Sequence, residues 1–214
     1  MKLRGPLVIA AIVSAAFFAG YAGTSSATVL CTIQSTECPP ANQLPVPETV
    51  LATSTSALFS PTPGTSTACK SSSLELKTTS NLGFSPEPLL AKVTSWTFSS
   101  CSSCTTVTVS PSPPSYKAEF VATQDGSPLG FHGNGKLKIL SPEIKLSGCP
   151  GSAVCTANAA SIVFEVKGGG PMKFIVSSAP MTVTGTASCG TTTAFSAEYS
   201  VVTKLKGLWL EPVP

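Results

Sequence analysis

The chain has a single aspartate and a single histidine, and both fall in the stretch TQDGSPLGFHGNGK. Asp125 and His132 lie seven residues apart. With one of the many serines as nucleophile, this pair could complete a Ser-His-Asp triad. No G-x-S-x-G turn is present to expose such a serine, and one histidine beside glycine-rich turns is typical of a solvated loop. We therefore expect no catalytic residue, with a secreted hydrolase that uses the Asp125/His132 loop as an alternative.

Four glutamates could supply the paired carboxylates of a glycoside hydrolase. Each of them alternates with apolar residues in a strand-like run, often beside a lysine. That pattern is typical of the outward face of a strand. We predict solvent-exposed positions for Glu75, Glu119, Glu165 and Glu198.

Cys101-Ser-Ser-Cys104 has the spacing of a redox site or of half a zinc site. A thioredoxin-type site needs its first cysteine at a helix N-terminus, whereas this motif lies between two strand-like runs. A zinc ribbon would need a second C-x-x-C, and Cys149 and Cys155 have the wrong spacing for one. We therefore predict no metal and no cofactor.

Two tryptophans could serve as stacking platforms for sugars. Trp96 lies in an apolar strand-like run and is expected in the core. Trp209 lies in GLWLEPVP, where Pro212 and Pro214 exclude a long central strand. We predict a short edge strand here, with Trp209 covering one end of the core, and keep a carbohydrate-binding module that uses Trp209 as a further alternative.

The first 27 residues have the three parts of a secretory signal. A basic start that ends at Arg4 precedes an apolar run from Leu7 to Ala22, and small residues follow up to Ala27. The apolar run is shorter than the ~20 residues that a spanning helix needs. We predict cleavage after Ala27, with Ala22 as the second choice, and a mature protein that is outside the membrane.

The charge of the mature chain limits its partners. Removing residues 1–27 leaves 11 basic and 10 acidic residues, and it removes Arg4, the only arginine. Nucleic-acid binding needs clustered lysine and arginine, and arginine is the residue that grips phosphate and carboxylate bidentately. We expect no nucleic-acid or membrane partner, and consider a cell-wall component or an extracellular protein or glycan instead.

All eight cysteines follow the predicted cleavage site, and their number is even. In an exported chain this favours up to four disulfides. Cys31 and Cys38 are the expected pair in the proline-rich N-terminal segment, and Cys69 is expected to pair with Cys101 or Cys104. The remaining partners stay open among Cys149, Cys155 and Cys189.

Alternation with a period of two residues predicts strands from residue 72 onward. The runs are 73–79, 93–100, 105–110, 115–123, 135–140, 161–168, 171–178, 181–186 and 194–202. Turn signals such as Gly133-Asn134-Gly135 and Gly168-Gly169-Gly170 separate them, and no long 3.6-residue period argues for a helix. We predict an all-β fold, a disulfide-linked antiparallel β-sandwich of roughly nine or ten strands.

We divide the chain into three parts. Residues 1–27 are the signal peptide. Residues 28–68 are a Thr/Ser/Pro-rich lead with short strands and a Cys31–Cys38 loop, packed on the main domain. Residues 69–214 are the β-sandwich domain.

The layout of cysteines, strands and glycine-rich turns resembles a known group of proteins. The matching stretches are TACKSSSLELKTT, SWTFSSCSSCTTVTV, GCPGSAVCTANAASIVFEVKGGGP and ASCGTTTAFSAEYSVV. They resemble uncharacterised secreted, cysteine-containing, β-rich proteins of high-GC Gram-positive bacteria, although the lead here is Pro-rich rather than Gly-rich. The resemblance supplies no catalytic residue.

Export, disulfides and strands are thus strongly indicated, whereas no catalytic constellation is. We expect an exported, non-enzymatic protein with a structural or binding role at the cell surface or outside the cell.

Overall fold

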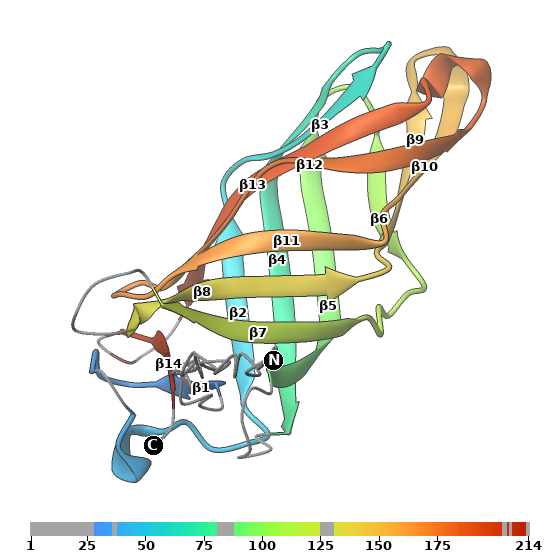
Figure 1. The fold of residues 1–214 in the computed structure, drawn as a ribbon. Helices are drawn as coiled ribbons and strands as arrows, with labels where there is room; N and C mark the ends of the chain where they lie inside the picture. The colour runs from blue at the N-terminus through green and yellow to red at the C-terminus, as the bar shows by residue number, and fades with distance from the viewer. Residues whose placement is uncertain are drawn as a thin grey trace, which may run out of the picture.

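The computed structural model describes residues 28–35, 38–80, 88–124, 131–202, 205 and 207–212 (Figure 1). The predicted signal peptide, residues 1–27, lies outside this part of the chain. The described strands are β1 (Thr28–Cys31), β2 (Thr49–Ser54), β3 (Ala57–Thr62), β4 (Thr67–Ser80), β5 (Leu89–Cys101), β6 (Thr106–Ser110), β7 (Lys117–Gln124), β8 (Phe131–Leu140), β9 (Glu143–Cys149), β10 (Ala153–Asn158), β11 (Ser161–Lys167), β12 (Lys173–Gly185), β13 (Thr192–Val202) and β14 (Trp209–Pro212). Three short 3₁₀ turns complete them: η1 (Pro40–Asn42), η2 (Pro150–Ser152) and η3 (Ala187–Cys189).

The fold is all-β, and its main sheet closes into an eight-stranded antiparallel barrel. Around the barrel the order is β2, β4, β5, β7, β8, β11, β12 and β13, and β13 pairs with β2 to close the circle. The predicted β-sandwich is therefore wrong. In a barrel as in a sandwich, inward and outward side chains alternate along each strand, so the period of two residues does not distinguish them.

One end of the barrel carries extra strands (Figure 1). Here β3 takes the place of β2 between β4 and β13. On the other side, β12 leaves β11 and pairs with β10, which continues through β9 to β6. We call this the β3/β10 end.

β2 and β3 follow one another between the same two neighbouring strands, β4 and β13, and a bulge separates them. Against β4 the register runs unbroken, whereas against β13 the four steps from Thr53 to Ala57 match three steps, from Ser200 to Ala197. One extra residue in one strand of a pair is a β-bulge, which bends the strand. Such breaks help explain why fourteen strands are described where nine or ten were expected.

Two sequence-based turns had different outcomes. Gly168–Gly170 lies in the predicted hairpin connection between the antiparallel strands β11 and β12. Gly133-Asn134-Gly135, by contrast, lies inside β8, so the turn predicted there is wrong. Gly133 has a φ of +75°, and a Cβ at this position would stand 2.1 Å from Trp209 Cδ1. The glycine therefore serves the packing of Trp209 rather than a turn.

Aromatic side chains fill the middle of the barrel. An interior of eight strands is just wide enough to be filled by side chains. The fully buried rings are Phe59, Phe120, Phe164, Phe174, Phe195 and Tyr199, and Trp96 is buried beside them, as predicted.

The polar atoms among these rings form one satisfied chain. Trp96 Nε1 donates to Tyr199 Oη over 2.9 Å, Tyr199 Oη lies 2.7 Å from Ser72 Oγ, and Ser72 donates to a backbone carbonyl. Burial raises the pKa of Tyr199 to about 12, although its two hydrogen bonds oppose the shift. The phenol thus stays protonated at neutral pH and acts as a structural donor.

The opposite end of the barrel is covered by the pair of β1 and β14 (Figure 1). Leu208 and Leu210 are buried in the main core. This agrees with the expected short C-terminal strand.

All eight cysteines are paired. The predicted Cys31–Cys38 bridge is present, and Cys69 pairs with Cys101 rather than with Cys104. The other two bridges are Cys104–Cys149 and Cys155–Cys189. Four disulfides indicate an oxidising environment.

Candidate functional site

A cavity of about 240 Å³ opens at the β3/β10 end of the barrel. Its base is formed by the buried side chains of Phe59, Leu146 and Val183. Its rim is more exposed and includes Pro61 of β3 and Pro150 of η2. The mouth of a β-barrel is a common place for a small-molecule site.

The space exists because the inward positions at this end carry small side chains. β4 places Thr67 inward here, β10 places Cys155 and β13 places Thr193. The aromatic rings in the middle of the barrel give way to threonine, cysteine and valine, which cannot fill the same width. The result is an apolar chamber above the packed core.

Two disulfides form part of the cavity wall. Cys104–Cys149 joins the turn after β5 to the end of β9, and Cys155–Cys189 joins β10 to η3. Gly185 makes the second bridge possible: its φ is +143°, and a Cβ there would stand 2.4 Å from the Val154 carbonyl oxygen and 3.0 Å from Cys189 Sγ.

Two threonines of the cavity lining carry buried hydroxyls. Thr67 is 2% exposed, and its Oγ1 lies 3.2 Å from Cys104 Sγ. Because the disulfide sulfur carries no proton, Thr67 is the donor. Thr193 is 6% exposed, and its Oγ1 is buried without a hydrogen-bond partner. A buried, unpaired hydroxyl costs about 1–3 kcal/mol. A ligand group that hydrogen-bonds Thr193 would therefore recover part of this free energy.

The cavity offers no charge. None of the described residues that line it is a lysine, arginine, histidine, aspartate or glutamate. Its cysteines are all in disulfides and do not titrate. The lining therefore provides shape, apolar surface and hydroxyl groups rather than a general acid or base.

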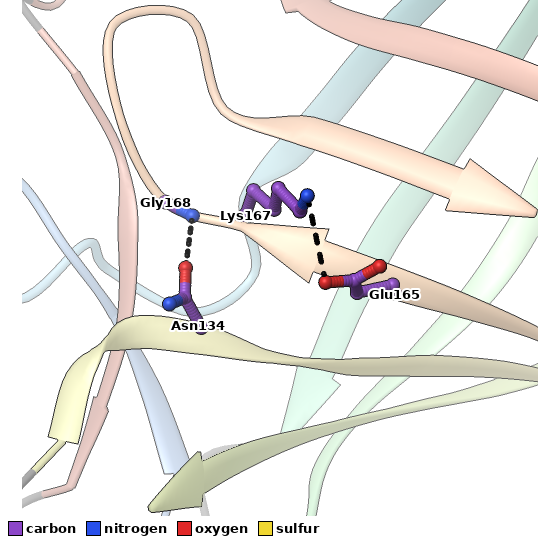
Figure 2. Close-up of polar contacts among 4 residues, drawn as sticks. All are labelled: Asn134, Glu165, Lys167 and Gly168. Atoms are coloured by element: carbon purple, nitrogen blue, oxygen red, sulfur yellow. Dashed lines mark hydrogen bonds and ion pairs between the residues drawn. The ribbon is translucent and has the colours of Figure 1, made fainter. Parts of the chain in front are cut away.

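The Asp125/His132 pair lies elsewhere in the chain. Asp125 is outside the described residues, and His132 is described only through its backbone in β8. The hydrolase alternative therefore stays a prediction. Close to His132 in sequence, Asn134 Oδ1 accepts a hydrogen bond from Gly168 N over 3.2 Å and ties β8 to the loop after β11 (Figure 2).

Of the four candidate glutamates, Glu165 and Glu198 are exposed, as predicted, whereas Glu75 and Glu119 are partly buried. Glu165 pairs with Lys167 at 3.7 Å (Figure 2), and Glu198 pairs with Lys173 at 2.7 Å. Glu119 stands opposite Lys138 in the register of β7 and β8. These positions suit solvation rather than acid–base catalysis.

Trp209 is half-buried in β14, where it packs on glycines. Cβ atoms placed on Gly133 and Gly168 would approach its ring to within about 2–3 Å. These glycines leave room for the indole ring, and the carbohydrate-binding alternative stays a prediction.

The C-x-x-C motif is divided between two bridges, because Cys101 pairs with Cys69 and Cys104 with Cys149. Among the described residues, no group of three or more His, Cys, Asp or Glu side chains could hold a metal ion.

Sequence reasoning missed both the cavity and the residue Thr193. Thr193 is one of three successive threonines, Thr191 to Thr193, in a chain in which about a quarter of the residues are Ser or Thr. Its importance depends on which strand lies opposite. The clustering of four cysteines at 149, 155, 189 and 104 around one chamber likewise depends on the strand order.

Comparisons with known proteins give no family for this chain: no family model, no curated protein and no solved structure matches it. Within the described part of the chain, no helix is long and apolar enough to cross a membrane.

A second buried polar group lies at the opposite end of the barrel. Glu211 of β14 is fully buried, and its Oε1 accepts a hydrogen bond from Ser35 N over 3.2 Å. Its Oε2 has no hydrogen-bond partner. Burial raises the pKa of Glu211 from 4.5 to about 7, although the hydrogen bond from Ser35 opposes this.

This carboxyl predicts a pH-dependent stability. Between about pH 4.5 and about pH 7 the folded state binds more protons than the unfolded state, so stability falls as the pH rises through this window. We expect Glu211→Gln to stabilise the protein at about pH 8 and to have little effect at about pH 4. Thermal melts across this range measure the difference.

The matched control for this prediction is Glu165→Gln on the exposed face of β11. It should leave the pH profile as in the wild type. A Glu211→Gln variant with an unchanged pH profile would contradict the role of this carboxyl.

Proposed function

We propose that the protein is an exported, non-enzymatic binding protein whose barrel end holds a small, largely apolar molecule. The observation that carries this proposal is the cavity of about 240 Å³ at the β3/β10 end, with a buried apolar base and walls fixed by two disulfides. A rigid, preformed site binds at a lower entropic cost than one that must be ordered by its ligand.

The volume sets the size of the ligand. Apolar protein cavities of ~150 Å³ bind benzene, whereas drug-sized ligands occupy sites of about 300–1,000 Å³. The cavity here lies between the two, which suits a molecule of about ten non-hydrogen atoms.

We propose that the protein is exported and acts outside the cell. The apolar segment of residues 1–27, the resemblance to secreted proteins and the four disulfides all support it. The bridges keep the cavity wall covalently closed outside the cell.

The test is calorimetry of the exported protein with para-isopropyltoluene and para-isopropylphenol. We expect a dissociation constant on the order of 0.1 mM for at least one of them. Val183→Phe introduces an aromatic ring at the base of the cavity, where it would occupy the space of the ligand. It should weaken binding at least about tenfold. Absence of binding by the wild type would overturn the proposal.

The matched control is Val154→Phe. Val154 lies on β10 with 43% of its surface exposed, and it is not part of the cavity lining. This variant should bind as the wild type does. Equal weakening in the two variants would show that binding takes place outside the cavity.

A further inference from the structure

We infer that the cavity selects a neutral molecule with an apolar body and a single hydroxyl or carbonyl group, and that Thr193 hydrogen-bonds this group. The inference rests on the binding function proposed above and adds the class of ligand and the residue that recognises it.

Neutrality follows from the lining. No described residue around the cavity carries a charge, so a carboxylate or an ammonium group would lose its hydration without an opposite charge to replace it. Ionised fatty acids and amines are therefore poor ligands for this chamber.

The single polar group follows from the hydroxyls. Of the four hydroxyl-bearing residues in the lining, Thr65 and Ser188 are exposed to solvent. Thr67 already donates to Cys104 Sγ, whereas Thr193 Oγ1 is buried and has no partner. In the register of β13, Thr193 stands between Pro61 of β3 and Met181 of β12. Neither side chain can form a strong hydrogen bond with the hydroxyl. Thr193 lines the cavity while its Oγ1 has almost no accessible surface, so we place the missing partner in the ligand, reached by a rotation about the Cα–Cβ bond that exchanges Oγ1 with Cγ2.

The chemistry of threonine sets the kind of partner. A hydroxyl both donates and accepts, so it can bind an alcohol, a phenol or a ketone. A site that hydrogen-bonds a ligand group discriminates against an analogue that lacks the group, because its own polar atom is then left unpaired.

The experiment uses two ligands of nearly equal shape. Para-isopropylphenol carries a hydroxyl where para-isopropyltoluene carries a methyl group. We expect the wild type to bind the phenol about tenfold more tightly than the hydrocarbon in calorimetry. Para-isopropylbenzoate, which is ionised at neutral pH, should bind at least about a hundredfold more weakly than the phenol.

The variants assign this preference to Thr193. Thr193→Val keeps the shape and removes the hydroxyl, so both neutral ligands should bind with similar affinity, while Thr193→Ser should keep the preference. If the wild type binds both neutral ligands equally, or if Thr193→Val keeps the preference, the inference is overturned while the proposed binding function stands. If neither ligand binds to the wild type, the binding function itself fails.

Discussion

Deleting residues 207–214 is expected to lower the Tm by roughly 10–20 °C. Leu208 and Leu210 are 3% and 0% exposed and belong to the main core. Burying a leucine side chain contributes about 2–5 kcal/mol against its truncation, and 1 kcal/mol corresponds to about 2–4 °C in a domain of this size. The deletion also removes the partner of β1. Thermal melts of the full-length and truncated mature proteins measure the effect.

Two point variants provide the control for this deletion. Leu210→Ala should lower the Tm markedly, whereas Leu205→Ala, at a side chain that is 41% exposed, should change it little. An unchanged Tm for the deletion would mean that the segment does not hold the barrel and is free to dock on a partner.

Replacing both Cys155 and Cys189 by serine is expected to weaken ligand binding as well as to lower the Tm. Loss of a native disulfide typically costs about 2–5 kcal/mol. This bridge also lines the cavity and fixes η3 against β10. We expect affinity for para-isopropylphenol to fall at least about tenfold, measured well below the Tm of the variant.

The control is the pair of substitutions Cys31→Ser and Cys38→Ser. This bridge lies at the end of the barrel covered by β1 and β14, away from the cavity. Its loss should lower the Tm yet leave the affinity unchanged. If both double variants lose affinity equally, the effect is one of general stability, and the Cys155–Cys189 bridge has no separate role in the cavity.

The all-β class and the faces of the strands could be predicted from the sequence, because each strand alternates apolar and polar residues on its own. Phe164 faces inward and Glu165 outward as expected. The local Cys31–Cys38 bridge was predictable for the same reason: it depends on a short stretch of chain.

Closure of the barrel was not predictable, because it depends on long-range pairing. The contact of β13 with β2 joins segments about 150 residues apart in the sequence, and nothing local in either segment marks it. The cavity depends on that pairing too. Thr67 and Thr193 line one chamber only when β3 lies between β4 and β13.

Glu211, by contrast, had a local signal in the sequence, although its burial could not be predicted from that signal alone. Its place in the apolar segment GLWLEPVP could have suggested an unusual carboxyl, since a glutamate is almost never fully buried without a partner. Its burial required knowledge that β14 pairs with β1 and covers the barrel end.

A crystal structure of the mature protein grown with para-isopropylphenol would show whether the cavity at the β3/β10 end holds a ligand. The binding function predicts the ring between the Cys104–Cys149 and Cys155–Cys189 bridges. The inferred role of Thr193 predicts, in addition, the phenol oxygen within hydrogen-bond distance of Thr193 Oγ1. A structure in which side chains fill this chamber, or in which the ligand binds only elsewhere, would contradict the binding function.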